Sequence, residues 1–325
     1  KNLLEGLDLS GAEADYFDLL AEQVPDPDAY LGTGVEVMRE LLRIENRLPR
    51  FRRLLRIWSG KIVQSIRARD FKAAGAWLRA VTDEPTYSQE FREEVERAVD
   101  HLAEPGLLRE MAVSLVEAER LEAAASLLSA WGPRLAAYLV ALLAEEDSAA
   151  HRSLIVDALA LVGRTDTRVL TGYLNDPRWY VVRNLAIAIG RTGRSQAVPA
   201  LQAVLSHPDH RVRVEALRAL VPLVGSEAIP ILIGAFDDPD LKVRQTAISL
   251  LRASGSPQVV AGLVGVVEQK KLAAAEMRQL VDVIADHGGP EASAALSRLA
   301  SRRFVFGGAR AARDAAREAL QRVRP

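Results

Sequence analysis

The feature that most constrains this fold is an internal repeat of about 31 residues in the second half of the chain. Pro177, Pro208 and Pro239 lie 31 residues apart, and each is followed by a Val-Arg pair, an alanine and a glycine. Self-similarity at a fixed period of about 20 to 50 residues is typical of stacked supersecondary units. The landmarks are Val182-Arg183, Val212-Arg213 and Val243-Arg244, then Ala186, Ala216 and Ala247, then Gly193, Gly225 and Gly255.

The middle unit shows what one repeat predicts. Pro208 and Asp209 supply a rigid turn and an acceptor for free backbone amides, so a helix begins there. Gly225 ends it, because glycine accepts a left-handed backbone, and a second helix is expected over 227–236. Two such helices cannot bury both of their faces alone, so successive units must stack. The expected inward-facing residues are Val212, Ala216, Leu217, Leu220 and Leu223, then Ile229, Leu232, Ile233 and Phe236.

The rest of the chain is helical in character but keeps the period less well. Weaker copies occur at 151–174 and 277–300, and 309–323 predicts a polar last helix of the kind that caps a solenoid. The segment VPDPDAYLGTG, residues 24–34, predicts a loop. We therefore expect a divergent helical region over 1–145 and a repeat domain with a C-terminal capping helix over 146–325. Helices in the first region are expected at 11–24, 34–47, 50–68, 70–81, 87–103, 105–118, 120–130 and 133–145.

Composition narrows the class of protein. There is no cysteine, so disulfides and thiolate metal sites are excluded and zinc would need histidine and carboxylate ligands. No apolar run of about 20 residues predicts a membrane span, and the first residues lack the pattern of a signal peptide. We therefore expect a cytoplasmic protein. Because the chain begins with Lys1 rather than Met, we also expect a domain of the full-length protein upstream.

Charge is distributed unevenly between the two halves. Residues 151–325 contain 24 Lys and Arg against 16 Asp and Glu, whereas residues 1–150 contain 18 against 27. Such asymmetry indicates either two interaction surfaces or simply two solvated surfaces on one long molecule. Arginines concentrate in the C-terminal run SRRFVFGGARAARDAAREALQRVR, which favours an acidic ligand or, as a minority hypothesis, nucleic acid.

The succession of Asp-Pro, Val-Arg, helically spaced Ala and Leu, and Gly resembles HEAT repeats of the short bacterial type, over roughly residues 150–300. The resemblance implies an all-α fold, a right-handed α-solenoid of stacked antiparallel helix pairs, with first helices on the convex side and second helices on the concave side. It also implies a structural ladder of aspartates and arginines between units. The ladder would use Asp176, Asp209 and Asp240 with Arg183, Arg213 and Arg244. Similar repeats occur in bacterial signalling and adaptor proteins, in lyases that attach bilin chromophores, and more distantly in DNA glycosylases.

Catalytic patterns are weak. His207, Asp209 and His210 form a His-rich cluster, but the equivalent turns NDPRW and DDPDL contain no histidine, so we interpret the cluster as a turn and expect no metal. Asp237, Asp238 and Asp240 resemble part of a calcium loop but are better explained as another inter-repeat turn. The chain has neither a GxSxG nor a GxxxxGK[ST] motif. We therefore predict no catalytic residue and no cofactor, and a scaffold rather than an enzyme.

The candidate partner-binding residues lie in the turns and helices of the repeats. Trp179 and Tyr180 stand where the neighbouring units have His-Arg and Leu-Lys, so they either anchor a partner or fill a wider gap between repeats. Positions that should point away from the packed face form a polar stripe on the concave side. The stripe comprises Asn184, Arg191, Arg218, Gln245 and Arg252. We expect a protein partner, or an upstream domain of the same protein, to bind there; the alternatives are nucleic acid at the basic C-terminal half and lyase-like handling of a chromophore or cofactor.

Overall fold

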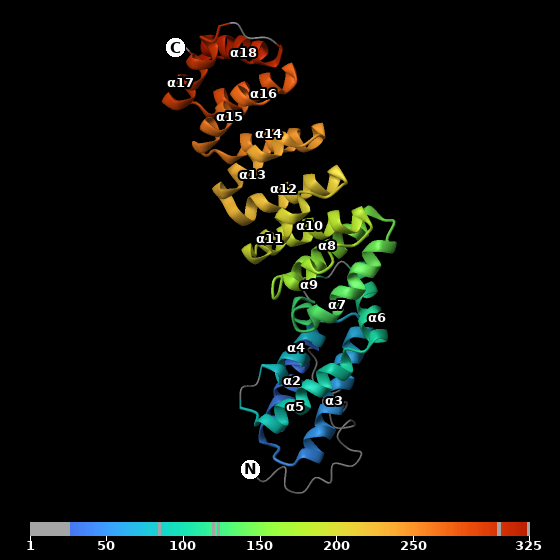
Figure 1. Cartoon of the computed structure of the whole chain (residues 1–325). Coiled ribbons are helices and arrows are strands. Elements are labelled where there is room, and N and C mark those ends of the chain that lie inside the picture. The colour runs from blue at the N-terminus through green and yellow to red at the C-terminus, as the bar shows by residue number, and fades with distance from the viewer. Residues whose placement is uncertain (1–26, 84–85, 119–120, 122–123, 304–306, 324–325) are drawn as a thin grey trace. The chain divides into compact units, whose positions relative to one another are not determined.

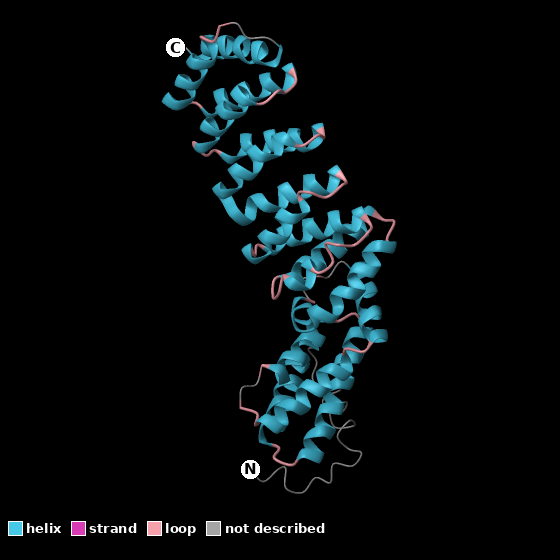
Figure 2. Ribbon diagram, viewed as in Figure 1, coloured by secondary structure: helices cyan, strands magenta, loops and turns pink. Residues whose placement is uncertain are grey.

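The structure is a computed structural model, which describes residues 27–83, 86–118, 121, 124–303 and 307–323. All helices and connections in these ranges form an all-α fold, as predicted (Figure 2). The helix expected over 11–24 lies outside the described residues. The α-helices are α2 Pro27–Ile44, α3 Leu48–Arg67, α4 Phe71–Thr82, α5 Gln89–Leu102, α6 Pro105–Ala118, α7 Ala125–Glu145, α8 Ala149–Gly163, α9 Arg168–Thr171, α10 Trp179–Thr192, α11 Val198–Val204, α12 His210–Val224, α13 Ala228–Gly234, α14 Leu241–Ser254, α15 Gln258–Gln269, α16 Ala274–His287, α17 Gly289–Ala300 and α18 Gly307–Val323.

The chain divides into two compact units between Thr165 and Asp166. The sequence places the boundary earlier, between residues 145 and 146. The difference is helix α8, which begins the first weak copy of the repeat but packs against α6 and α7. Because its neighbours precede it in the chain, α8 belongs to the first unit, and each unit is described separately below.

Two expectations for the first unit are wrong. Residues 27–34 of the predicted loop at 24–34 are helical, because α2 begins at Pro27, and proline is well accommodated in the first turn of a helix. The two helices expected at 120–130 and 133–145 are one helix, α7. Gly132 lies against α8, where an added Cβ would be 3.1 Å from Val162 Cγ1. The glycine therefore allows close helix packing here instead of ending the helix.

The second unit is a stack of helix pairs, as the repeat predicts (Figure 1). The first helices of successive pairs, α10, α12, α14 and α16, pack side by side and form what we call the first-helix layer. The second helices α11, α13, α15 and α17 form the second-helix layer, and α18 packs against α16 and α17. This arrangement is an α-solenoid, and α18 closes its end in the place of the predicted cap.

Local signals set the ends of these helices as predicted. The side chains of Asp209 and Asp240 each accept a hydrogen bond from the backbone N–H two residues on, at the starts of α12 and α14. Gly193 and Gly255 end α10 and α14 with φ of 69° and 60°, in the left-handed region that favours glycine. The residues expected to face inward are buried, except Leu223 and Ile233, which are half-buried.

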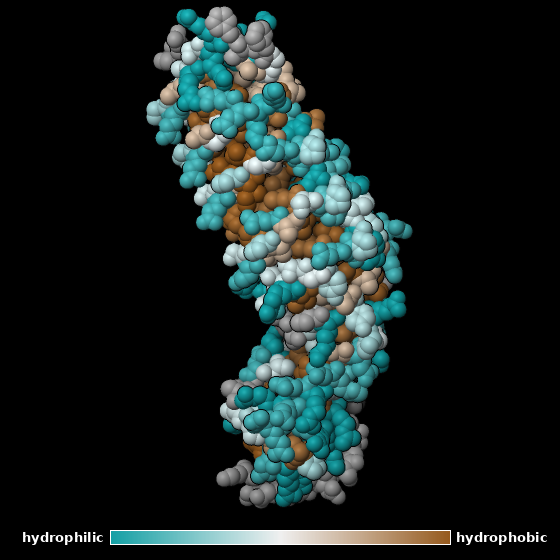
Figure 3. All heavy atoms as spheres, viewed as in Figure 1, coloured by the Kyte–Doolittle hydropathy of each residue, from teal (hydrophilic) through white to brown (hydrophobic). Residues whose placement is uncertain are grey.

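One stretch, His210–Asp237, is long and apolar enough by length and composition to cross a membrane. It is not one continuous α-helix: α12 ends at Val224, Gly225 has a φ of 57°, and short 3-10 turns flank α13. Several of its buried side chains, among them Leu217 and Leu232, belong to a core cluster that extends from Val214 in α12 to Ala319 in α18. Apolar residues reach the surface in places on the face shown in Figure 3.

Candidate partner-binding surface

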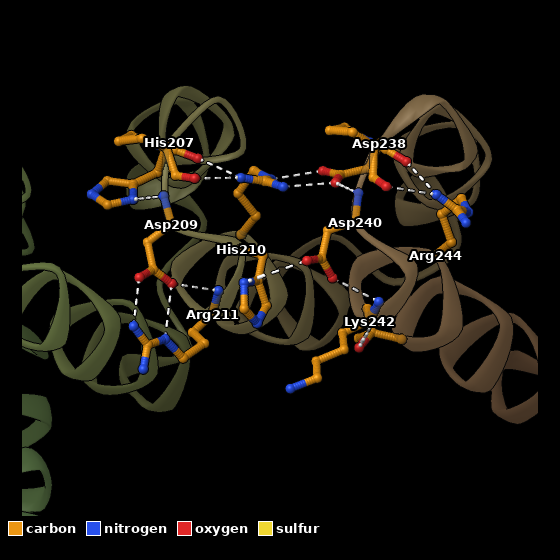
Figure 4. Close-up of polar contacts among 12 residues, drawn as sticks. His207, Asp209, His210, Arg211, Asp238, Asp240, Lys242 and Arg244 are labelled. Atoms are coloured by element: carbon orange, nitrogen blue, oxygen red, sulfur yellow. Dashed lines mark hydrogen bonds and ion pairs between the residues drawn. The ribbon is translucent and has the colours of Figure 1, made fainter.

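The three predicted ladder arginines do connect neighbouring repeats. Arg213 donates two hydrogen bonds of 2.7 Å to the carboxylate of Asp238, 25 residues along the chain. Its third nitrogen donates to the backbone carbonyls of His207 and Pro208, at 2.8 and 3.0 Å. Figure 4 shows the two turns, with His207 in one and Asp238 in the other. Arg213 therefore connects the turn that contains His207 and Pro208 to the next turn, which contains Asp238, through hydrogen bonds.

Arg244 and Arg183 also pair with a carboxylate of the next repeat, 32 residues along the chain. Arg244 donates to Glu276 at 2.6 and 3.2 Å and to the carbonyls of Asp238 and Pro239. Arg183 donates to Glu215 at 3.3 Å. The carboxylates of the ladder are therefore Glu215, Asp238 and Glu276, and not the predicted aspartates.

The predicted ladder aspartates have a local role instead. Asp209 accepts hydrogen bonds from the backbone N–H of Arg211 and from its guanidinium, at 2.8 to 3.0 Å. Asp176 makes the same contacts with Arg178. Asp240 caps α14 through the N–H of Lys242 and lies 3.5 Å from His210 Nδ1. An aspartate side chain can accept a hydrogen bond from the free backbone N–H two residues later without any contact to another repeat. These aspartates therefore accept hydrogen bonds within their own turns and do not pair with the ladder arginines.

These ion pairs lower the pKa values of two carboxyl groups in the turns, those of Asp209 and Asp238. The Arg211 side chain lowers the pKa of Asp209 to about 2, and the N–H of the same arginine contributes. Burial raises the pKa of Asp238, but hydrogen bonds from Arg213 and from the N–H of Asp240 outweigh it, so the net pKa is lowered. Both carboxylates are therefore ionised at neutral pH, which matches a structural role in the turns.

The His-Asp-His cluster does not converge on a common point. His207 Nδ1 accepts from the N–H of Asp209 at 3.0 Å, Asp209 turns to Arg211, and His210 faces Asp240 (Figure 4). Among the residues that the structure describes, no group of three or more His, Cys, Asp or Glu side chains is placed to hold a metal ion. These contacts support the interpretation of the cluster as a turn.

Trp179 and Tyr180 contribute to the joint between two repeats. The guanidinium carbon of Arg211, on the next first helix, lies 3.3 Å from the ring centroid of Trp179, a cation–π geometry. The two rings pack edge to face with centroids 5.9 Å apart, and both side chains are half-buried. This favours the gap-filling alternative over a free anchor for a partner.

The expected polar stripe lies on α10, α12 and α14, in the first-helix layer, and several members are engaged within the chain. Asn184 is only 7% exposed, because α10 and α12 pack closely at this position. Gln245 donates to Gln279 at 2.8 Å, Arg218 to Glu215 at 2.9 Å, and Arg252 lies 3.3 Å from Asp286. Arg191, Arg218 and Arg252 are exposed.

The second-helix layer contains a surface that sequence reasoning missed. Helices α11, α13 and α15 contain a single charged residue, Glu268, which is half-buried and paired with Arg298. We call the exposed residues of these three helices the neutral face. They are Pro199, Gln202, Ala203, Pro230, Gly234, Gln258, Ala261 and Gln269. The signal was present in the uncharged segments VPALQAV, AIPILIG and QVVAGLVGVV, of which we considered only the inward-facing residues of the middle one.

The arginines of α18 are largely paired. Arg310 and Arg313 lie beside Asp314, and Arg278 and Arg322 lie within 3.9 Å of Glu318. Arg317 donates to the carbonyl of Ala300 at 3.1 Å. Two carboxylates are thus shared by four arginines, so only part of the positive charge that favoured nucleic acid is balanced locally.

Comparison with known proteins identifies the repeat. The family model for HEAT repeats matches residues 167–252 and 204–275. No curated protein matches the chain in sequence. Similar solved structures include human deoxyhypusine hydroxylase in complex with glycerol, with 16% identity over 79% of this chain and 98% of that one and a TM-score of 0.32. They also include the complex of CpcE and CpcF of phycocyanin lyase from Nostoc sp. PCC7120, with 17% identity over 80% and 92% and a TM-score of 0.29.

Proposed function

We propose that this chain, a HEAT-repeat protein, is a scaffold without catalytic activity of its own that binds a protein partner through the neutral face of α11, α13 and α15. HEAT repeats suggest a protein-interaction scaffold. The observation that carries the choice of face is the absence of charge from its exposed positions in the described part of these helices. The partner is expected to present an equally uncharged surface.

Physical reasons favour the neutral face over the first-helix layer. The cores of protein interfaces are depleted of charged residues, because removing a charge from water is costly unless it is paired. Proline, alanine and glycine lose almost no side-chain entropy when a partner covers them. The half-buried apolar side chains Ile231 and Ile233 of α13 add contact area beside them.

The arginines of the first-helix layer form the alternative surface. Arg191, Arg218 and Arg252 could bind carboxylates of a partner, as the polar stripe suggests. Arg218 and Arg252, however, already lie against Glu215 and Asp286. A partner there would have to displace a carboxylate of this chain, so it would gain less than at an unpaired arginine.

Opposed sets of substitutions test the two surfaces. Partners are captured from cells with the wild-type chain, and their affinities for two double variants are then measured. One variant carries Ala203→Glu and Ala261→Glu, and the other carries Arg218→Glu and Arg252→Glu. We expect the first pair to weaken binding by about tenfold or more, since it places two charges in the interface core, and the second pair to change it little. Circular dichroism verifies folding. The opposite order of effects would assign binding to the first-helix layer.

A further inference from the structure

The first unit contains a groove between α3, α5 and α6 with a volume of about 750 Å³. Its floor is apolar, with Leu55 and Val63 from α3, Leu102 from α5 and Leu107 from α6 among its lining residues. On α3 the lining runs from Arg52 to Arg67, a length of about 22 Å at 1.5 Å per residue. A helix of about four turns has this length.

The lining of the groove contains four arginines and three glutamates, so its charges are nearly balanced. Arg52 and Arg97 both contact the carboxylate of Glu94, which is 7% exposed. Arg97 also lies 3.6 Å from Glu93, so the two arginines at this end face two carboxylates. At the other end Arg67 lies 3.7 Å from Glu110, so that pair is balanced.

Arg56 and His101 line the groove between these two ends. Arg56 is exposed and, within the ranges that the structure describes, contacts no carboxylate. His101 lies 3.1 Å from Glu104, at the start of α6. In the middle of the groove, the guanidinium of Arg56 can therefore bind a carboxylate of a ligand without breaking an ion pair within the chain.

Two glycines in the groove have no explanation in the packing of the chain itself. Gly60 lies in the interior of the 20-residue helix α3, and Gly106 in the first turn of α6. An added Cβ at either position would meet nothing within 4 Å. Glycine inside a helix costs about 1 kcal/mol relative to alanine. Glycine at such a position leaves room for the backbone of another chain to approach the helix closely.

We propose that this groove binds an amphipathic helix of a partner protein, one that has apolar residues on one face and carboxylates along its flanks. The apolar stripe covers the leucine and valine floor, a carboxylate of the partner pairs with Arg56, and the helix approaches over Gly60. This is helix-in-groove recognition. It is independent of the neutral face, which lies in the other unit.

The test measures fluorescence anisotropy of a labelled amphipathic peptide of about 15 residues, with leucines spaced i, i+3, i+4, i+7 and glutamates at the flanks, titrated with the full chain. We expect binding that weakens with salt. Gly60→Leu, which fills the groove with a better helix former, and Arg56→Glu should each weaken binding by about tenfold or more. Matched controls are Gln89→Leu and Gln89→Glu, at an exposed position of α5 that does not line the groove and lies on the opposite side of the helix from its lining residues; both should bind as the wild type.

Several outcomes would overturn the inference. These are equal binding of a peptide with lysine in place of glutamate, binding that survives both groove substitutions, or no binding. Displacement by inorganic phosphate at comparable ionic strength would assign the arginines to a small anion instead. Ala261→Glu on the neutral face should leave peptide binding unchanged, so the failure of either proposal can be recognised separately.

Discussion

Arg213 is the most buried arginine of the ladder. It is 9% exposed, and its partner Asp238 is similarly covered. Arg211, two residues earlier, also contacts two repeats, through Asp209 and the ring of Trp179, but its side chain is 48% exposed. Arg213 and Arg211 thus make similar contacts but differ in burial, and the more buried arginine should contribute more to stability.

We expect Arg213→Ala to lower the free energy of unfolding by about 3 kcal/mol or more, because it leaves a covered carboxylate and two backbone carbonyls without their donor. Arg211→Ala should cost about 1 kcal/mol or less, because water replaces an exposed pair. Urea unfolding followed by circular dichroism measures both. Equal losses would mean that depth does not govern this network.

The lowered pKa of Asp209 predicts a pH dependence. A carboxylate whose pKa falls to about 2 on folding, from about 3.9 in the unfolded chain, stabilises the fold above pH 4, and this contribution is lost as the pH falls through 2. Asp209→Asn keeps a good N-cap but removes the ion pair with Arg211. The stability difference between wild type and variant should therefore be constant from pH 7 to about 4.5 and shrink below pH 4, as urea unfolding at each pH would show. A difference that persists unchanged to pH 2 would contradict the assignment.

Among the helices, close approach of α10 and α12 depends on one position. An added Cβ at Gly190 would lie 2.9 Å from the Cα and Cβ of Ala219, a separation that forces the two helices apart. Gly265, in α15, is also inside a helix, but an added Cβ there would meet nothing within 4 Å. The same substitution should therefore have opposite effects at the two sites.

Gly265→Ala is expected to raise stability by about 0.5 to 1 kcal/mol, since alanine is the better helix former. Gly190→Ala is expected to lower it by about 1 to 3 kcal/mol, because overpacking outweighs the same propensity gain. Thermal unfolding measures both shifts. A stabilising effect at Gly190 would show that the α10–α12 contact is looser than the structure indicates.

In the whole molecule, each unit is compact by itself. The core cluster of the second unit draws its buried residues from Val214 to Ala319, all within residues 166–325. A solenoid whose repeats contact mainly their neighbours should not need distant parts of the chain to fold.

We therefore expect the fragment 166–325, produced alone, to be helical and to unfold cooperatively on heating, as measured by circular dichroism at 222 nm. The fragment 200–325 serves as the comparison. It lacks α10, which packs against α12, so it should be less stable. A non-cooperative transition in fragment 166–325 would show that its core is incomplete without the first unit.

The sequence by itself determined the repeat, the α-solenoid class, the helix starts at Asp209 and Asp240, the glycine ends and the arginines that join the repeats. These features depend on residues within a few positions of one another, or on a period that recurs along the chain. Tertiary structure alone decided that Arg213 pairs with Asp238, 25 residues away, and that Arg244 pairs with Glu276, 32 residues away. It also decided the burial of Asn184 and the formation of the single helix α7. It also produced the groove of the first unit. These features depend on how far one helix is rotated and shifted against the next, and that geometry follows from side-chain packing between helices, which local patterns do not specify.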